Sequence, residues 1–299
     1  MAILLATNFD AAEQAQWLAL LQVALHDETL VTQRLAGDGE HIDVALVANP
    51  RPGALQGLPR LQLVQSLWAG VEKLLADPGI PADVPLARMV DPAMNEAMAE
   101  TALWAVLALQ RGFFDYAAQQ RERRWLQLQL WRADETRVAV LGLGQMGQTV
   151  LRRLAANGFP VTGWHTRSGP LDAVLAEADI VINLLPLTPA TRGLFDARRL
   201  AAMRAGASLV NLARGAHVLD ADLLAALESG HLQRAVLDVF QTEPLPAGHA
   251  FWSHPRVTVL PHVAAPTDPR SAAAIVAANV RRLRAGRPIE HVVDRRRGY

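Results

Sequence analysis

Short apolar runs alternate with helical patterns of apolar residues along most of the chain. In its first part, apolar runs predict four strands, at residues 3–6, 42–48, 61–67 and 86–90. Apolar residues recur at helical spacing over 11–25, directly after Asp10, which is a favourable helix N-cap. Strands that alternate with helices in this way are typical of a parallel sheet covered by helices.

The same alternation is stronger after Thr136. Apolar runs predict six further strands, at residues 137–141, 161–164, 180–185, 208–212, 234–238 and 257–260. Helical patterns lie between them or flank them, at residues 92–111, 145–157, 171–178, 220–227 and 268–285, and a second helical stretch follows 92–111 up to about residue 124. Asp91 can cap the first of these helices, and Gly158 can end the helix 145–157. The predicted fold class is α/β, with two doubly wound parallel-sheet lobes facing each other across a cleft. The long helices 92–111 and 268–285 are the expected crossovers between the lobes.

Composition limits the possible partners. The formal net charge is zero, which gives no basis for attraction to nucleic acid or to a membrane surface. No apolar stretch approaches the roughly 20 residues that cross a bilayer, and the first residues are interpreted as a strand, not as a signal peptide. Cysteine is absent, which excludes thiol nucleophiles, disulfides and thiolate metal sites and favours a cytoplasmic location.

Two further classes of site are also excluded. Lys73 is the only lysine, and it lies outside any Gly-Lys-Ser/Thr phosphate loop. His249 and His254 have no regular ligand face between them because Pro255 and loop residues surround them. No metal site is therefore expected.

A glycine-rich turn follows the predicted strand 137–141. Glycines 142, 144 and 147 have the spacing GxGxxG, and the next helix opens at Gln145 and Met146. The first glycine permits the tight turn, the second lets backbone approach a pyrophosphate, and the third lets helix pack on strand. Glycines in a loop are often only turn residues, but this strand, turn and helix together predict a dinucleotide site at Gly142, Gly144, Gln145, Met146 and Gly147.

The end of the second strand of this block indicates which dinucleotide is bound. An NAD-selective site has an acidic residue there, whereas this chain has no carboxylate before Asp172. His165, Thr166 and Arg167 stand at this place instead, and Arg167 can clamp a 2′-phosphate while Thr166 donates to it. NADP(H) is therefore the preferred coenzyme and NAD(H) a possible one, unless Arg167 is only a solvated loop residue.

Three polar residues then follow in the order that reduction of a 2-keto acid requires. Arg214 follows strand 208–212 and His262 follows strand 257–260, so both should project from the edge where open α/β sheets bind ligands. A guanidinium can hold carboxylate and carbonyl oxygens together, and an imidazole can donate a proton near neutral pH. Glu243 is the acid expected to orient His262 and raise its pKa. The alternative for Arg214 is a surface loop arginine.

Together these motifs resemble the D-isomer-specific 2-hydroxyacid dehydrogenases, and most of all their A-type glyoxylate/hydroxypyruvate reductases. The segments that carry the resemblance are 142–147, 182–189, 211–215, 237–240, 243–246, 261–265 and the tail 293–299. The resemblance covers nearly the whole chain. It implies a flavodoxin-like substrate domain at 1–93 and 270–299, and a Rossmann-type dinucleotide-binding domain at 94–269. It also implies a homodimer, for which Trp104 and residues 113–131 offer apolar surface.

The resemblance assigns roles to further residues. Ala69 and Gly70 match a loop whose backbone N–H groups receive the substrate carboxylate. Trp68 enters this loop and either narrows the pocket toward two- and three-carbon acids or packs against neighbours. The positions that match the lining of the coenzyme site are Leu185, Pro186, Leu212, Ala213 and Asp238. The chain departs from the family in having Glu72 in place of the usual Asp and a short loop after the second strand, so the 2′-phosphate contacts stay open.

The expected function is reduction of glyoxylate and hydroxypyruvate, small 2-keto acids, to glycolate and D-glycerate by hydride transfer from NADPH. Arg214, Glu243 and His262 are the expected catalytic residues. One alternative is another D-2-hydroxyacid dehydrogenase, acting on phosphoglycerate or a bulkier 2-keto acid. The other is a nucleotide-sensing interaction protein that kept the fold without the reaction.

Overall fold

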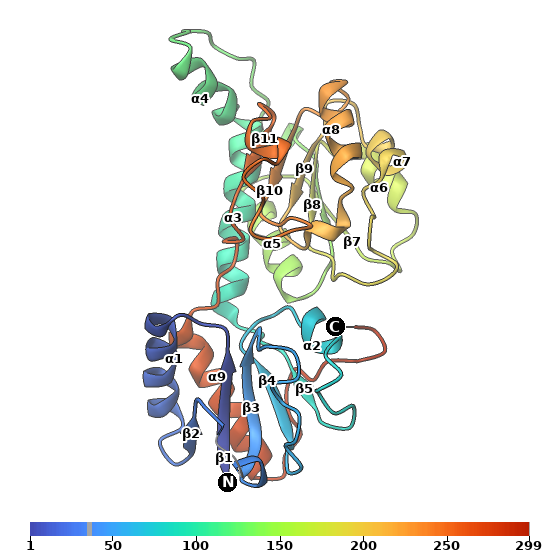
Figure 1. Cartoon of the computed structure of the whole chain (residues 1–299). Helices are drawn as coiled ribbons and strands as arrows, with labels where there is room; N and C mark the ends of the chain where they lie inside the picture. The colour runs from blue at the N-terminus through green and yellow to red at the C-terminus, as the bar shows by residue number, and fades with distance from the viewer. Residues whose placement is uncertain (35–37, 299) are drawn as a thin grey trace. The chain divides into compact units, whose positions relative to one another are not determined.

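The computed structural model describes residues 1–34 and 38–298, and it divides into two compact units (Figure 1). Unit 1 comprises Met1–Ala93 and Thr267–Tyr299, and unit 2 comprises Met94–Pro266. Tyr299, which ends the tail that resembles the reductase subtype, lies outside the described residues.

Unit 1 is built on a five-stranded parallel sheet of order β2-β1-β3-β4-β5. Its strands are β1 (Ala2–Thr7), β2 (Thr29–Val31), β3 (Ile42–Ala48), β4 (Leu63–Ser66) and β5 (Leu86–Ala87). Its helices are α1 (Ala11–Ala24), α2 (Glu72–Leu75) and α9 (Pro269–Arg284), with a 3₁₀ turn at Asp38–Glu40. This strand order is that of flavodoxin-like folds.

The long helices of unit 1 begin where capping residues predict. The Asp10 carboxylate accepts the Glu13 N–H at 2.8 Å, and the Asp268 carboxylate accepts the Arg270 N–H at 2.9 Å. Helix α9 is tied to the sheet by polar contacts as well as by its apolar face. Asn279 donates to buried Gln65 at 2.7 Å, and Arg284 forms an ion pair with the buried carboxylate of Asp43.

Unit 2 is built on a six-stranded parallel sheet of order β11-β10-β9-β8-β6-β7. Its strands are β6 (Val138–Leu141), β7 (Val161–Trp164), β8 (Ile180–Asn183), β9 (Ser208–Asn211), β10 (Arg234–Leu237) and β11 (Val257–Val259). Its helices are α3 (Pro92–Gln110), which starts two residues before the unit does, α4 (Phe113–Arg121), α5 (Gln145–Ala156), α6 (Leu171–Glu177), α7 (Ala197–Ala202) and α8 (Asp220–Glu228). Three 3₁₀ turns lie at Ala133–Glu135, Gly215–His217 and Ala250–Trp252.

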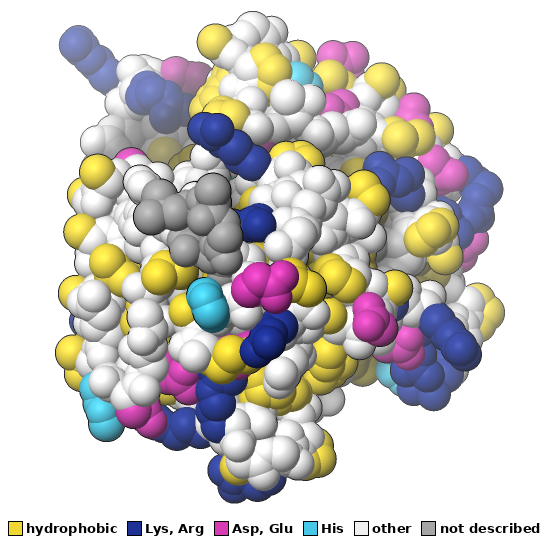
Figure 2. Space-filling view, turned by 60° about the horizontal axis from the view of Figure 1, so that its bottom comes forward, with side chains coloured by type: hydrophobic (Ala, Val, Ile, Leu, Met, Phe, Trp, Pro, Cys, Tyr) yellow, Lys and Arg dark blue, Asp and Glu magenta, His cyan; other side chains and the backbone are white. Residues whose placement is uncertain are grey.

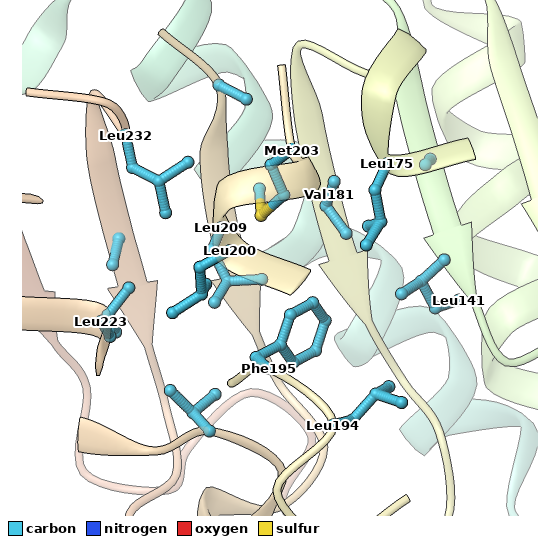
Figure 3. Close-up of a cluster of buried hydrophobic side chains, with 14 of the residues drawn as sticks. Leu141, Leu175, Val181, Leu194, Phe195, Leu200, Met203, Leu209, Leu223 and Leu232 are labelled. Carbon is cyan, nitrogen blue, oxygen red and sulfur yellow. The ribbon is translucent and has the colours of Figure 1, made fainter. Parts of the chain in front are cut away.

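Helices cover both faces of the unit 2 sheet, so most residues of its strands are apolar. Alternate residues of each strand enter two separate cores. Leu141, Val181 and Leu209 face Leu175, Leu200 and Leu223 of α6, α7 and α8 around Phe195 (Figure 3). On the other face, strand residues such as Val140 pack against α3 and α5. The predicted class, two doubly wound parallel sheets, is confirmed.

The elements that the pattern did not predict are all short ones. Strand β2 has three residues, helix α2 has four and helix α7 has six, too few for a period to emerge. The predicted strands 61–67 and 86–90 are also longer than the observed β4 and β5. After Ala87 the chain leaves the ladder, because Arg88 donates its N–H to His291 and Met89 donates to Trp68.

Two features of the surface stand out. Helix α4 and the segment after it project from the rest of unit 2 (Figure 1), and Trp125 there is 98% exposed. On the face that Figure 2 displays, basic and acidic side chains are interspersed, in keeping with the balanced net charge. Among the described residues, no helix is long and apolar enough to cross a bilayer.

Candidate active site

The predicted site residues of unit 2 gather at the carboxyl ends of its parallel strands. Strand β6 lies between β7 and β8. The chain therefore runs from β6 to β7 on one side, and then crosses back to place β8 on the other side of β6. Such a switch point in strand order opens a crevice at the carboxyl edge of an open α/β sheet. The glycine-rich turn follows β6, and Arg214 and His262 follow β9 and β11.

The glycine-rich turn has three glycines, and the space around the three differs. Gly142 has a φ of +100°, and a Cβ there would meet the backbone of Leu184 at 2.6 Å. A Cβ on Gly147 would overlap the carbonyl of Gly142, so helix α5 could not pack against the turn. At Gly144, by contrast, φ is −69° and a Cβ would meet no protein atom within 4 Å.

Gly144 therefore supplies a test of whether a dinucleotide fits. The fold itself does not require glycine there, but the N-terminus of α5 starts at the next residue, Gln145. A pyrophosphate approaching the free N–H groups of this helix would come close to backbone at position 144. The residues present fit a bound dinucleotide.

The next loop has an open, polar surface. The His165 N–H donates to Ser168 Oγ at 3.1 Å, and the Arg167 N–H donates to His165 Nδ1 at 3.0 Å. These bonds form a compact turn directly after β7, from which the side chains of Thr166 and Arg167 extend into solvent. The turn leads straight into α6, which accounts for its short length.

A buried polar network that the sequence did not predict holds the loops after β8 and β9. Asn183 Nδ2 donates to Asn211 Oδ1 at 3.0 Å and lies 2.9 Å from His217 Nδ1. The Asn183 and Asn211 side-chain oxygens accept the N–H groups of Leu185 and Ala213. The only available signal was the position of each Asn at the end of an apolar strand.

This network fixes the backbone on both sides of Arg214. Asn211 Nδ2 donates to the Arg214 carbonyl at 3.0 Å, and the Arg214 guanidinium donates to the Ala213 carbonyl at 2.6 Å. Gly215 packs so closely on Phe240 that any Cβ would overlap the Phe240 backbone. The half-buried arginine is therefore held in place by its main chain.

His262 and Glu243 form the pair that was predicted. His262 Nδ1 lies 2.7 Å from Glu243 Oε2, and the other oxygen, Oε1, accepts the Phe240 N–H at 2.9 Å. Glu243 is thus oriented by backbone and in turn orients the imidazole. Because Nδ1 is engaged, Nε2 is the nitrogen left to face a substrate.

Buried Asp238 shapes the turn that carries His262. Its carboxylate accepts the N–H groups of Val263 at 2.7 Å and Ala264 at 3.0 Å, and its carbonyl accepts the His262 N–H at 2.9 Å. His262 has a φ of +57°, an unfavourable conformation for a residue with a Cβ. Thr101 of α3 adds a bond of 3.0 Å to the Ala264 carbonyl. These contacts hold His262 in its left-handed conformation.

The charges at this edge act on one another. The hydrogen bond with Glu243 raises the pKa of His262 above its ordinary value, although burial and the charge of Arg214 oppose the shift. Burial raises the pKa of Glu243, but bonds from His262 and Phe240 and the charges of His262 and Arg214 outweigh it and lower that pKa. Arg214 thus lies within electrostatic range of both partners, and the site favours an imidazolium beside a carboxylate.

Unit 1 contains the other predicted site residues. Ser66 Oγ bonds to both the N–H and the carbonyl of Trp68, which fixes the start of the loop containing Ala69 and Gly70. The Trp68 ring packs edge-on against Phe9 and Trp17, with ring centres 5.7 and 6.2 Å away. Trp68 therefore has a packing role, whereas its effect on pocket size stays a prediction. No group of three or more metal-ligating side chains lies close together in the part of the chain that the structure describes.

Comparison with known proteins agrees with this geometry. Residues 103–264 match the family described as D-isomer specific 2-hydroxyacid dehydrogenase, NAD binding domain. A protein of Serratia proteamaculans (strain 568) named glyoxylate/hydroxypyruvate reductase A is 41% identical, covering 95% of this chain and 96% of its own. A namesake from Yersinia enterocolitica is 39% identical, covering 96% of this chain and 97% of its own.

A solved structure extends the likeness to three dimensions. It is an NADPH-dependent glyoxylate/hydroxypyruvate reductase from Sinorhizobium meliloti, in complex with NADP and sulfate. The two structures superpose with a TM-score of 0.94 at 34% identity, covering 100% of this chain and 99% of that chain.

Proposed function

The chain belongs to the D-isomer-specific 2-hydroxyacid dehydrogenases, and we propose that it reduces glyoxylate and hydroxypyruvate to glycolate and D-glycerate with NADPH. As a member of this family it is an NAD(P)-dependent oxidoreductase. The observation that carries the choice of residues is the His262–Glu243 bond of 2.7 Å at the edge that also bears Arg214. The substrates are those named for the relatives from Serratia and Sinorhizobium.

The three residues divide the work of the reduction. Arg214 holds the keto acid by its carboxylate and carbonyl oxygens, and its charge stabilises the carbonyl oxygen as that oxygen becomes negative. His262, protonated and oriented through Nδ1 by Glu243, transfers the proton on Nε2 to this oxygen. The half-exposed imidazole then regains a proton from solvent.

NADPH would supply the hydride that the keto carbon accepts. Gly142, Gly144 and Gly147 with the N–H groups at Gln145 and Met146 would hold its pyrophosphate. His165, Thr166 and Arg167 would take the 2′-phosphate. The remaining contacts are assigned to Leu185, Pro186, Leu212, Ala213 and Asp238.

Arg167→Glu should weaken the preference for the phosphorylated coenzyme. It removes charge-assisted bonds to the 2′-phosphate and adds repulsion, so we expect the KM for NADPH to rise about 10- to 100-fold. The KM for NADH should change little, because NADH has no phosphate there. Steady-state kinetics with both coenzymes measures the ratio, and Arg192→Glu, another exposed arginine of unit 2, is the matched control. Equal changes in the two KM values would show that Arg167 does not bind the phosphate.

Glu243→Gln should move the pH profile of the reaction. Protonated His262 is the acid, so kcat/KM for reduction is highest below its pKa and declines as pH rises through that pKa. Glu243 raises this pKa. A glutamine can still accept the Phe240 N–H but presents an amide N–H₂ to Nδ1, which favours neutral imidazole. The decline should therefore begin at a lower pH, whereas Glu228→Gln, at an exposed residue of α8, should leave the profile in place.

The substrate loop of unit 1 is assigned by family resemblance. The N–H groups of Ala69 and Gly70 would receive the substrate carboxylate, and Trp68 would limit the length of the acid. Turnover of a panel of keto acids by the purified enzyme, from glyoxylate to bulky acids and a phosphorylated one, tests this choice. A clear preference for a bulky or phosphorylated acid would favour the first alternative function.

From the absence of cysteine we assign the protein to the cytoplasm. We also assign the projecting segment 113–131 to a homodimer interface. Trp125, Leu126 and Trp131 are 98%, 52% and 62% exposed, an apolar surface that a second copy would cover. Replacing Trp125 and Trp131 with Glu should convert a particle of twice the 32.4 kDa chain mass into a monomer in light scattering. Val23→Glu, which charges an isolated residue 76% exposed on α1, should leave the mass unchanged. A monomeric wild type would refute the assignment.

A further inference from the structure

Arg88 of unit 1 has a side chain that the described structure leaves without a partner. It is half-buried, yet among residues 1–34 and 38–298 no hydrogen bond, ion pair or ring contact involves its guanidinium. Burial lowers its pKa, and no neighbouring acid offsets that effect. A cation in this situation loses hydration without gaining a counter-charge.

The other arginines show how unusual this is. Within the described residues, those with buried or half-buried side chains have partners. Arg234 pairs with Asp115 at 2.9 Å, Arg295 donates to the carbonyls of Pro81 and Val84, and Arg284 pairs with Glu28 and Asp43. The arginines without partners, such as Arg51 and Arg60, are exposed to water. Among the arginines of residues 1–34 and 38–298, Arg88 is the one that combines partial burial with a guanidinium bound to neither an acid nor a carbonyl.

Its place in the fold is equally informative. Arg88 directly follows β5, at the carboxyl edge of the parallel sheet, where open α/β sheets bind ligands. Its neighbour Met89 donates an N–H to the Trp68 carbonyl at 3.0 Å, so Arg88 lies beside the loop that runs through Ala69 and Gly70. Its own N–H donates to His291, which fixes the backbone at the base of the side chain.

We propose that Arg88 is a second cationic anchor for the substrate, and that it binds the carboxylate of the 2-keto acid beside the loop formed by Trp68, Ala69 and Gly70. This inference rests on the proposed function, which supplies an anionic substrate. A carboxylate would provide the missing counter-charge and accept two parallel bonds from the planar guanidinium. Because every 2-keto acid has this group, Arg88 should contribute to binding of all of them and not to the choice among them.

A structural role for Arg88 predicts the opposite effect on stability. An arginine that holds the fold together lowers the melting temperature when it is removed, as a broken buried ion pair does. An arginine kept for a ligand is a cost to the free protein, so its replacement by an apolar side chain of similar length should leave the melting temperature equal or higher. The two roles can therefore be separated in one variant.

The experiment compares Arg88→Met with Arg88→Lys and the control Arg60→Met. Arg60 is an exposed arginine that precedes β4, at the opposite edge of the same sheet. For each full-length protein, titration calorimetry measures the Kd of oxalate, an unreactive dicarboxylate, with NADP⁺ present. Steady-state kinetics gives KM and kcat for glyoxylate and hydroxypyruvate, and thermal unfolding gives Tm.

We expect Arg88→Met to raise the oxalate Kd and both KM values about 10- to 100-fold, as the loss of a charge-assisted contact does. Arg88→Lys should keep part of the affinity, Arg60→Met all of it, and Tm should not fall. An unchanged oxalate Kd, or a lower Tm with unchanged affinity, would overturn the inference. If the wild type binds oxalate through Arg88 but turns over no keto acid, the proposed function fails while the anion site stands.

Discussion

His262→Ala is expected to lower kcat for keto-acid reduction by about 10²- to 10⁴-fold, the usual contribution of a positioned general acid. The imidazole is the group whose protonated form the structure favours, through the bond of 2.7 Å from Glu243. Without it, the oxygen of the reduced carbonyl has to take its proton from water. Single-turnover measurement of NADPH oxidation reports this chemical step directly.

The loss should be confined to the chemical step. NADPH fluorescence titration should give a Kd close to that of the wild type, because the glycine-rich turn and the loop after β7 are untouched. His231→Ala is the matched control, since His231 precedes β10 at the opposite edge of the same sheet and bonds to the Met203 carbonyl at 3.0 Å. Undiminished turnover by His262→Ala would show that His262 is not the proton donor, whereas absence of turnover in the wild type would favour the alternative of an interaction protein that only senses nucleotide.

Arg214→Met is expected to lower kcat/KM by at least about 10²- to 10³-fold, the effect of removing a group that stabilises negative charge in the transition state. KM should rise and kcat should fall, because the guanidinium binds the ground-state carboxylate and also stabilises the developing alkoxide. Arg214→Lys should recover little, since an ammonium cannot reproduce two parallel bonds. Arg198→Met removes an exposed arginine of α7 and should have little effect.

A second measurement separates charge from misfolding. The Arg214 backbone is held by Asn211 and by the close contact of Gly215 with Phe240, so the shortened side chain should leave a cavity of the right shape. Added guanidinium ion should then restore part of the activity of Arg214→Ala. Full activity in the unsupplemented variant would refute the assigned role.

The long periodic elements and the polar residues at strand ends could be predicted from sequence. Strands such as β6 and β8 are buried and continuous, and a side chain that follows a parallel strand must emerge at the carboxyl edge. His262 and Glu243 both follow strands of this sheet, and their pairing could therefore be predicted from the sequence. Helix α7 and strand β2 could not be predicted, because tertiary packing and not local period stabilises such short elements.

Contacts between distant segments could not be predicted from the sequence either. The network of Asn183, Asn211 and His217 joins three separate segments, and each residue alone is an ordinary amide or imidazole. Arg88 belongs to no motif at all. Its interest arises only when burial and the absence of an acid in the described residues are seen together.

The open space beside Gly144 has an evolutionary consequence. An alanine at this position would not disturb the backbone or the neighbouring side chains of the protein itself. The space around it gives a stable fold no reason to keep this glycine, whereas dinucleotide binding gives one. In a lineage that gave up its coenzyme, position 144 should accumulate substitutions early, while Gly142 and Gly147 persist.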